Sequence, residues 1–395
     1  MTRETDISPV PKTYIQVDLS LLSHNIRELR NASRAPACMA VVKANAYGHG
    51  AVATAKTALA CGVEWLAVAR VSEAYELRCA HICAPILLFG DVDDRHLAYL
   101  SSHDIRITIS SEEDALRISK KAVKLGLIIK AHIKIDTGMG RLGLYFQPPR
   151  TTVSSTTDVE GTREMVLRIA ALEGIDVEGV YTHFANADSR DKTHAGRQLE
   201  IFKDLLNALK DKGFFPKICH AANSAATIDM PQAHFSMIRP GIALYGLWPS
   251  DEVDKTRVNL KPVMSIISKI IQLKKVPAGY KISYGNTYTT DCDTMIATVP
   301  IGYADGYSRL LSSRGAMLVK GMRAPIVGRI CMDFTMIDVG AIKDVALGDD
   351  VVVMGCQKDN CISADELAQL TGTINYEIVS SLSRRMPLRH IHPEE

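Results

Sequence analysis

Short apolar segments alternate with helical segments along the first 246 residues, and this alternation limits the folds open to the chain. Eight segments read as buried strands: residues 39–43, 65–69, 85–89, 105–109, 127–135, 178–182, 218–221 and 236–239. Helical segments flank and separate them, among them residues 18–31, 51–60, 72–80, 93–100, 162–172 and 198–211. Strands joined by helices are typical of parallel sheets, and eight such units favour a closed (β/α)₈ barrel. A doubly wound open sheet is the alternative.

After about Leu247 the pattern becomes that of a β domain. The strand-like segments are residues 263–276, 294–301, 316–319, 324–339 and 351–353. Capping boxes predict two helix starts, at Ser110 before a helix that ends at Gly126 and at Ser363. A further helical stretch is predicted at 376–385. The polar segment 250–257 places the boundary between Gly246 and Lys261.

Composition and the N-terminal sequence argue against several classes of protein. The formal net charge is +2, with 47% hydrophobic and 23% charged residues, so nothing indicates a nucleic-acid or membrane partner. The N-terminal sequence MTRETDISPVPK has no apolar segment, which predicts no signal peptide, and no stretch is long enough to span a membrane. The nine cysteines are an odd number without metal-ligand spacing, so we expect reduced thiols and a cytoplasmic location.

Chemically competent residues follow five of the predicted strands. These are Lys43, the segment from Asp136 to Arg141, His183, the segment from His220 to Ser224, and Arg239. In barrel enzymes the carboxyl ends of the strands carry the active site. Lys43 ends an apolar strand, where an amine can serve as a nucleophile that forms a Schiff base with a carbonyl cofactor. The alternative is a surface lysine in water.

The segment 138–143 matches the G-x-G-x-x-G pattern of dinucleotide-binding proteins but lacks its context. No helix is predicted after it, and no acidic residue ends a following strand at the required distance, so we reject a dinucleotide site. In the preceding strand Lys130, His132, Lys134 and Asp136 share one face, which would line the lumen of a barrel. A lumenal Lys134 would need neutralisation or a partner. An edge strand with one solvated face is the alternative.

Asn223 and Ser224 open a helix after the seventh strand, next to Gly241 after the eighth, and this arrangement suits a phosphate. An ordinary helix cap at Ser224 is the alternative. A lysine, a phosphate site and a histidine able to stack on a ring together indicate pyridoxal phosphate. The β domain adds Tyr284 and the segments 302–306 and 329–333, each of which ordinary turns and rim charges would also explain.

Taken together, the motifs resemble those of the pyridoxal-phosphate-dependent alanine racemases of fold-type III. In order along almost the whole chain they are VVKANAYGHG, KIDTGMGRLG, YTHFANAD, HAANSAA, IRPGIALYG, ISYGNTY, VPIGYADGY, VGRICMDF and TINYEIV. The resemblance implies a (β/α)₈ barrel over residues 13–247 and a mainly-β domain formed by residues 1–12 and 248–395. It also implies pyridoxal 5'-phosphate as cofactor, alanine as substrate, and a head-to-tail homodimer whose active sites are shared between subunits.

The resemblance assigns roles to individual positions. Lys43 and Tyr284 correspond to the two catalytic bases, the first for the D-enantiomer and the second, from the other subunit, for the L-enantiomer. Cofactor-binding positions are Lys43, Tyr47, Arg141, His183, Asn223, Ser224, Arg239, Gly241, Ile242 and Tyr376. The substrate carboxylate would meet Arg141 and the other subunit's Met332. The substrate access corridor corresponds to Asp188, Tyr303, Arg309, Arg329 and Ile374. Lys134 matches a lysine that is often carbamylated.

The chain departs from the family pattern in two places, at Phe334 and at the pair Ala221-Ala222, and neither departure touches the proposed chemistry. A racemase for serine or a broader substrate set is the nearest alternative function. A decarboxylase on the same barrel would use a carboxylate at the pyridine nitrogen, where this chain offers Arg239. A non-catalytic cofactor carrier would lack the β domain.

Overall fold

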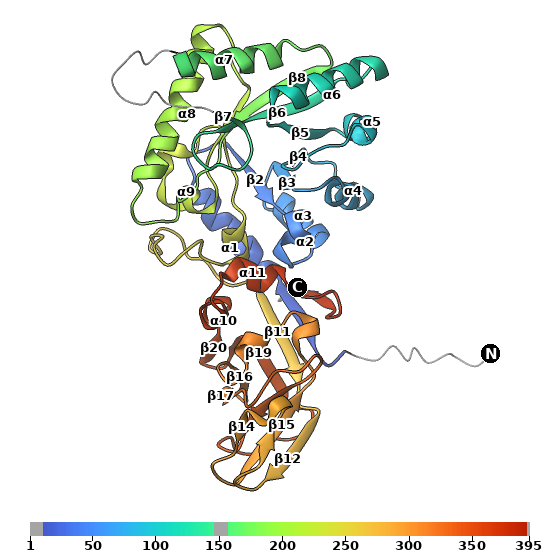
Figure 1. Ribbon diagram of the computed structural model, residues 1–395, viewed down its shortest axis with the longest axis vertical. Helices are drawn as coiled ribbons and strands as arrows, with labels where there is room; N and C mark the ends of the chain where they lie inside the picture. Colours follow the sequence, from blue (N-terminus) through green and yellow to red (C-terminus); the bar gives the residue numbers. More distant parts are fainter. Residues whose placement is uncertain (1–10, 146–156, 393–395) are drawn as a thin grey trace, which may run out of the picture. The chain divides into compact units, whose positions relative to one another are not determined.

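The computed structural model describes residues 11–145 and 157–392 (Figure 1). Internal contacts divide the chain into two compact units. The barrel unit comprises Leu21–Ala46 and Gly50–Lys261, and the β unit comprises the described residues up to Ser20, Tyr47–His49 and the described residues from Pro262. The boundaries predicted at 12/13 and 247/248 differ from this division and stay a prediction.

Eight parallel strands form the barrel unit, as predicted, and the doubly wound alternative is excluded. They are β2 (Ala37–Val41), β3 (Trp65–Val68), β4 (Ile86–Leu88), β5 (Ile105–Ile109), β6 (Ile129–Asp136), β8 (Ile175–Tyr181), β9 (Ile218–His220) and β10 (Met237–Ile238). The ladder runs β10-β2-β3-β4-β5-β6-β8-β9, and the short β7 (Leu144–Tyr145) pairs with β6. The two end strands of this ladder, β9 and β10, come close to closing the barrel: the N–H of Ser236, just before β10, donates to the carbonyl of Cys219 in β9 at 3.0 Å.

Helices of this unit lie outside the strands that they connect (Figure 1). They are α1 (Leu19–Ala32), α3 (Ala51–Ala60), α4 (Val71–Cys79), α5 (Leu97–Ser102), α6 (Glu112–Leu125), α7 (Thr157–Ala170), α8 (Thr193–Asp211) and α9 (Ser224–Asp229). On α1 the side chains of Leu22, Ile26 and Leu29 are buried on one face, as the spacing predicts. The predicted cap of α6 is wrong by one residue: Ser111, not Ser110, accepts the Asp114 N–H.

The β unit is built on a sheet that takes one of its interior strands, β1, from near the N-terminus. The order is β17-β16-β19-β11-β1-β21, with β20 (Asn360–Ile362) paired to β19. Their bounds are β1 (Tyr14–Asp18), β11 (Met264–Lys269), β16 (Ala316–Val319), β17 (Met322–Pro325), β19 (Asp350–Gln357) and β21 (Leu388–Ile391). Strand β1 runs parallel to β21 and antiparallel to β11, a pairing that the sequence did not predict.

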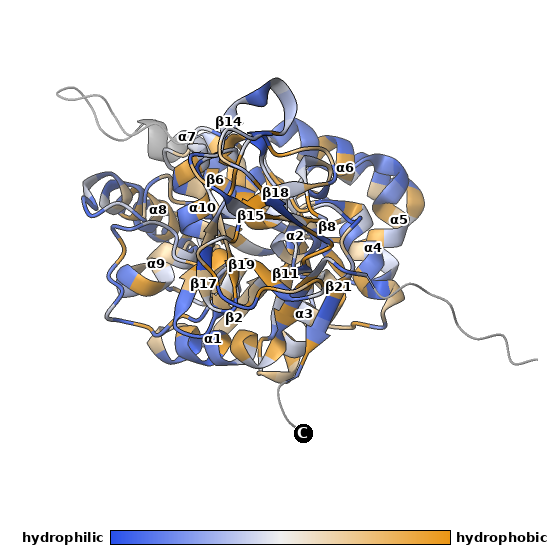
Figure 2. Cartoon of the chain, turned by 90° about the horizontal axis from the view of Figure 1, so that it is seen from below, coloured by the Kyte–Doolittle hydropathy of each residue, from blue (hydrophilic) through white to orange (hydrophobic). Residues whose placement is uncertain are grey.

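Two smaller sheets complete this unit. One contains β12 (Gln272–Val276), β15 (Thr294–Val299) and β18 (Thr335–Asp338), and the other β13 (Lys281–Ile282) and β14 (Tyr288–Thr289). Val276, Ile282, Ile296 and Val327 form a buried cluster between them. The apolar residues of β15 and β19 stand out as orange segments in Figure 2. Helices α10 (Ala364–Thr371) and α11 (Asn375–Ser380) follow β20, and Ser363 caps α10 as predicted.

Three sequence predictions for this unit are wrong in detail. The segment 263–276 is two strands, β11 and β12, that belong to different sheets. The segment 324–339 is also interrupted: β17 ends at Pro325 and β18 begins at Thr335. Between them Gly328 has a φ of 75°, which breaks an extended strand and leaves a loop that carries Arg329 and Met332. The last predicted helix, 376–385, ends at Ser380 in α11.

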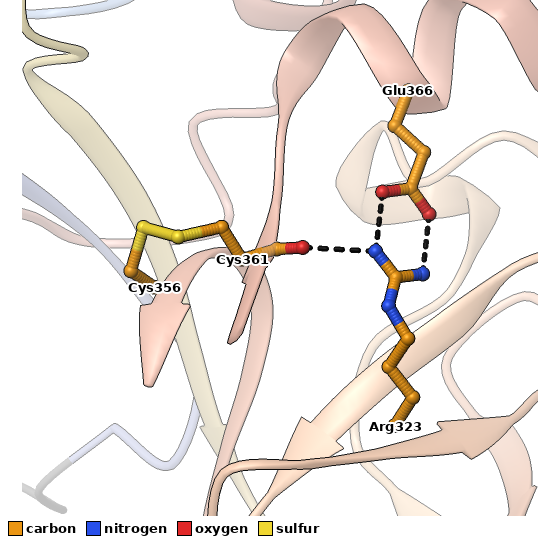
Figure 3. The surroundings of a disulfide bond; sticks show 4 residues. All are labelled: Arg323, Cys356, Cys361 and Glu366. Atoms are coloured by element: carbon orange, nitrogen blue, oxygen red, sulfur yellow. Dashed lines mark hydrogen bonds and ion pairs between the residues drawn. A yellow bond between two sulfur atoms is a disulfide. The ribbon is translucent and has the colours of Figure 1, made fainter. Parts of the chain in front are cut away.

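Two cysteines are joined, so the prediction of nine reduced thiols is wrong for them. Cys356 and Cys361 face each other across β19 and β20 and form a disulfide with a Cα–Cα distance of 4.1 Å (Figure 3). Nearby, Arg323 donates to the Cys361 carbonyl at 2.9 Å and to both oxygens of Glu366. The other seven cysteines are free. Among the described residues, no helix combines the length and the apolar character that crossing a bilayer requires.

Candidate active site

Five candidate residues lie just beyond the carboxyl ends of barrel strands. Lys43 follows β2, Arg141 follows β6, His183 follows β8, Ser224 follows β9 and Arg239 follows β10. The carboxyl ends of parallel strands meet on one face of a barrel. The fold therefore brings these residues, scattered over about half of the chain, to the same rim.

The turn that begins after Lys43 is left-handed. Ala44, Asn45, Ala46 and Tyr47 all have φ between 52° and 54°. Each non-glycine residue in this conformation costs roughly 1–2 kcal/mol, so the turn needs external support. The Ala46 N–H donates to the Val42 carbonyl, and the Asn45 side chain accepts the N–H of Ala51, both at 2.9 Å. The loop predicted here is thus a fixed, strained turn that holds Lys43 in one position.

Positive charges gather around the two lysines of the rim. Burial, together with the charge of Arg141, lowers the pKa of the half-buried Lys43, and Glu73 opposes this shift. Lys134 is buried on the lumenal face of β6, where desolvation and the charges of Arg141 and Arg239 lower its pKa to about 8. A lysine with a lowered pKa is more often a neutral amine, which is the nucleophilic form.

Asp136 explains the glycine-rich segment that resembles a dinucleotide fingerprint. Its carboxylate accepts the backbone N–H groups of Gly138, Met139 and Gly140 at 2.8–3.1 Å. Gly143 has a φ of 126°, and a Cβ there would lie 2.8 Å from the Asp136 nitrogen. The glycines therefore allow a tight turn around Asp136 that carries Arg141, which is consistent with the rejection of a dinucleotide site.

Arg239 makes four contacts inside the barrel through its two Nη atoms. Its Nη2 donates to the carbonyls of Thr182 at 2.8 Å and Ala221 at 3.0 Å, and lies 3.3 Å from Nδ1 of His183. Its Nη1 lies 2.9 Å from Nδ1 of His220. Desolvation lowers the pKa of Arg239 to about 10, so the guanidinium remains charged at neutral pH.

The contact with Arg239 fixes the tautomers of two buried histidines. A guanidinium can only donate, so His220 Nδ1 must accept and His220 carries its proton on Nε2. That nitrogen lies 2.8 Å from His132 Nδ1, which must then accept in turn. Burial and nearby arginines hold the pKa of His220 well below its usual range and lower that of His132 to about 3. Both rings are therefore neutral. His220 accepts a hydrogen bond from Arg239, and His132 holds His220 in turn, so the pair fixes the orientation of the guanidinium.

The ends of β9 and β10 are tied together by Ser224. Its hydroxyl accepts the N–H of Gly241 at 2.8 Å and that of Ala243 at 3.3 Å. Asn223 caps α9 by accepting the Ala226 N–H, so its side chain has a structural role. Ile242 is buried at the start of a single helical turn, Ile242–Tyr245. The Ser224 hydroxyl keeps its own proton to donate to an anion.

Several other candidates belong to the β unit. The rings of Tyr47 and Tyr376 lie 6.2 Å apart, and a Cβ on Gly48 would approach the Val379 carbonyl to 2.2 Å, so the segment Tyr47–His49 packs on α11. Tyr303 is held near Met332 because its N–H donates to the Cys331 carbonyl at 3.1 Å.

Tyr284 is presented by a second constrained turn. Ser283 has a φ of 66°, and its hydroxyl donates to the Arg329 carbonyl at 2.5 Å. This bond ties the turn to the loop before β18, so Arg329 and Tyr284 are neighbours within the unit. Tyr284, Met332, Tyr303, Arg309 and Ile374 are all exposed in the single chain. Asp188 lies in the barrel unit, where its carbonyl accepts the Ser250 hydroxyl.

Comparison with known proteins assigns this arrangement to a family. The model of the alanine racemase N-terminal domain matches residues 17–249, and that of the C-terminal domain matches residues 263–390. The alanine racemase of Desulfosudis oleivorans is 46% identical over 376 residues, which cover 95% of each chain. That of Methanococcus maripaludis is 47% identical over 380 residues, 96% of this chain and 98% of the relative. The chain belongs to the alanine racemase family.

Solved structures of the family agree with this assignment. An alanine racemase from Clostridium difficile 630 superposes with a TM-score of 0.88 at 38% identity, covering 97% of this chain and 96% of that one. An alanine racemase from Bacillus anthracis with bound L-Ala-P gives a TM-score of 0.86 at 38% identity, with coverage of 98% and 96%. The fold is that of the alanine racemases, and the family models and near-full-length relatives show that the protein is an amino-acid racemase.

Sequence reasoning did not single out Glu73, and it named three other residues without their roles: Asp136 as the centre of a turn, and His132 and His220 as a support for Arg239. Asp136 could have been found, because an aspartate followed by glycines is a typical side-chain-capped turn. The other three have no local signal, since their partners are distant in sequence. The left-handed turn was also missed, because alanines do not favour that conformation.

Proposed function

We propose that the protein interconverts L- and D-alanine with pyridoxal 5'-phosphate, using Lys43 and Tyr284 as bases on opposite faces of the substrate. The observation that supports this most strongly is the state of Lys43. It is a half-buried amine with a lowered pKa, fixed by a strained turn at a barrel rim. That combination suits an amine which must react with a carbonyl and later accept a proton.

The donor set of the barrel fits this cofactor. The Ser224 hydroxyl accepts the Gly241 N–H and can itself donate, so it would offer a donor for a phosphate at the start of α9. His183 is positioned by Arg239 and its pKa is far below the usual range, so it presents a neutral ring. Tyr47 and Tyr376 complete the phosphate set on the strength of the family resemblance. When bound, the cofactor withdraws electrons from the substrate and so acidifies its α-hydrogen.

Arg239 bears on the kind of reaction that the site supports. A guanidinium with a pKa of about 10 still holds its proton at pH 7 and can only donate. Arg239 would therefore hold the cofactor's pyridine nitrogen by donating a hydrogen bond to it and would not protonate it. The cofactor would then be a weaker electron acceptor, which would disfavour decarboxylation and transamination and leave proton exchange at the α-carbon.

Proton exchange needs one base on each face of the substrate. Lys43 removes the α-proton of D-alanine, and Tyr284 removes that of L-alanine. The base that does not abstract returns a proton to the opposite face. An unperturbed phenol has a pKa of about 10, so Tyr284 needs cations or a hydrogen-bond partner to act as a base. Arg141 and Met332 hold the substrate carboxylate.

We propose that Tyr284 and Met332 are supplied by a second copy of the chain in a homodimer. Within the β unit these side chains are exposed although they are aromatic or apolar, and Tyr303 and Ile374 share this feature. Exposed apolar side chains gathered around a functional residue are typical of an interface. We also propose a cytoplasmic location, where the seven free cysteines remain reduced.

The test is direct. Purified protein reconstituted with pyridoxal 5'-phosphate is incubated with L-alanine, and the loss of optical rotation is followed to the racemic mixture. Absence of turnover in cofactor-loaded protein would refute the proposal. Parallel assays with L-serine measure specificity. We expect a higher kcat/KM for alanine, since a broader racemase finds no support among the relatives, which are named alanine racemases.

A further inference from the structure

Glu73 connects the start of helix α4 to the turn that carries Lys43. One carboxylate oxygen accepts the N–H of Ala44 at 2.6 Å. The other accepts the N–H groups of Ala69 at 2.8 Å and Arg70 at 3.0 Å. The bond to Arg70 belongs to an ordinary capping box, in which a glutamate three residues into a helix accepts the N-cap N–H. The bond to Ala44 has no place in that motif, because Ala44 follows a different strand.

The position of Ala44 gives this extra bond its importance. Ala44 is the first residue of the left-handed turn and the immediate neighbour of Lys43. Bonds within the turn are local, such as those from Ala46 to Val42, from Gly50 to Asn45 and from Ala51 to Asn45. The Glu73 carboxylate therefore ties the first residue of the turn to α4. A charged acceptor forms a shorter and stronger bond than a neutral one, as the 2.6 Å distance indicates.

The charge of Glu73 also matters at the amine. Arg141 and Lys134 face Lys43 as cations, and His183 faces it as a neutral ring. Glu73 is the negative group whose field acts in the opposite direction and raises the pKa of Lys43. The carboxylate thus acts on Lys43 both through the backbone and through the electrostatic field.

We propose that Glu73 is a positioning residue for Lys43: its carboxylate fixes the turn that holds the amine, and its charge balances Arg141. The inference depends on the proposed function only through the role of Lys43. Glu73 touches neither substrate nor cofactor in this account.

The first experiment tests whether the charge of Glu73 raises the pKa of Lys43. Cofactor-free protein is mixed with pyridoxal 5'-phosphate over a range of pH, and the absorbance of the lysine-bound cofactor is followed with time. The neutral amine reacts, so the midpoint of the rate profile reports the pKa of Lys43. In Glu73→Gln we expect this midpoint to move about one pH unit toward acid, because an attractive charge is lost. The matched control is Glu76→Gln, an exposed glutamate on the same helix, which should leave the midpoint unchanged.

The second experiment tests the hydrogen bond from the Ala44 N–H to Glu73, and it needs no cofactor. Amide hydrogen exchange at Ala44 should accelerate about tenfold in Glu73→Ala, the factor expected for loss of one charge-assisted hydrogen bond. The exposed control Glu76→Ala should show the exchange rate of the unmodified protein. If Glu73→Ala does not fold, the pH profile of Glu73→Gln decides alone.

The outcomes separate the inference from the proposed function. If the unmodified protein gives no lysine-bound absorbance at any pH, the proposed function fails. If it does, but the Glu73→Gln profile superimposes on that of the unmodified protein, the inference is overturned. Glu73 is then only the cap of α4. Unchanged exchange at Ala44 in a folded Glu73→Ala variant would overturn it as well.

Discussion

The barrel unit and the β unit present their candidate residues in opposite ways. In the barrel, Lys134 is 4% exposed and Arg239 is 3% exposed, and desolvation moves the pKa of both. In the β unit, Tyr284 is 70% exposed and Met332 is 52% exposed. In the proposed site, the barrel supplies buried groups whose pKa values are already shifted within one chain. The β unit supplies exposed side chains, which the proposed homodimer would cover with a second chain.

The barrel half should be indispensable for cofactor attachment. We expect Lys43→Ala to lose the absorbance of the lysine-bound cofactor and to lower racemisation by at least roughly 10⁴-fold, the upper range for a proton-transfer group. Spectra of the reconstituted variant and chiral analysis of alanine measure both effects. The control is Lys56→Ala, an exposed lysine on α3. Retention of the absorbance in Lys43→Ala would contradict the assignment.

The β half should affect proton transfer and leave cofactor attachment intact. We expect Tyr284→Phe to lower kcat/KM by roughly 10²–10⁴-fold. Because the enantiomers are equally stable, both directions must fall by the same factor. Solvent deuterium should still enter D-alanine, where Lys43 acts, but not L-alanine.

The neighbouring variant Tyr280→Phe is the control for this experiment, and it should retain activity. Deuterium entering both enantiomers of alanine at the unmodified rate in Tyr284→Phe would show that the phenol is not the second base.

Burial of Arg239 should make it important for stability, unlike exposed arginines. Arg239→Met leaves His220 and the carbonyls of Thr182 and Ala221 without their donor. Unsatisfied buried acceptors cost about 1–3 kcal/mol each, so we expect the free energy of unfolding to fall by about 3–5 kcal/mol. Urea denaturation measures it, with the exposed Arg314→Met as control at under about 0.5 kcal/mol. If both substitutions lowered the free energy of unfolding equally, the buried Arg239 of the barrel unit would be no more important for stability than the exposed Arg314 of the β unit.

Lys134 should make stability depend on pH. Its folded pKa of about 8 is below the unfolded value of about 10.4, so the unfolded state binds more protons between these values. The penalty for the buried ammonium is therefore complete below about pH 8 and is relieved as the pH rises toward 10.4. In carbon-dioxide-free buffer, Lys134→Met should be more stable than the unmodified protein at pH 7, and this advantage should shrink by pH 10.

Adding bicarbonate to the same stability measurement tests whether Lys134 becomes carbamylated. Carbon dioxide adds to the neutral amine of Lys134 with release of one proton, which yields a carbamate anion able to pair with Arg141. Bicarbonate should therefore stabilise the unmodified protein and leave Lys134→Met unchanged. A mass that shows only the bare amine at ambient carbon dioxide would contradict carbamylation.

The smallest effect is expected at the disulfide of the β unit. The Cys356–Cys361 bond closes a loop of only a few residues, so its loss should lower the free energy of unfolding by about 2 kcal/mol or less. Denaturation of Cys356→Ser measures this, and the exposed free cysteine Cys292 provides the control Cys292→Ser. A fall in kcat/KM comparable to that expected for Tyr284→Phe would mean that the paired strands β19 and β20 act on the proposed site.

Local sequence patterns predicted the structure correctly where residues close together in the sequence determine it. The apolar face of α1, the cap at Ser363 and the strand–helix alternation were predicted correctly because each depends on residues a few positions apart. The break between β17 and β18 was missed because both halves of the segment 324–339 are rich in apolar residues, and Gly328 alone was not taken as a break. Only the choice between two sheets distinguishes its halves.

The sequence by itself determined the barrel, the strand ends that carry Lys43, His183 and Arg239, and the family, because ordered motifs and alternating periodicity are local properties. Only the tertiary structure decided how those groups are tuned. Desolvation, the neutral histidine pair beneath Arg239 and the Glu73 tie to Ala44 arise when strands distant in sequence are brought within hydrogen-bond range. Electrostatic energies depend on distance and burial, and neither can be read from the order of residues.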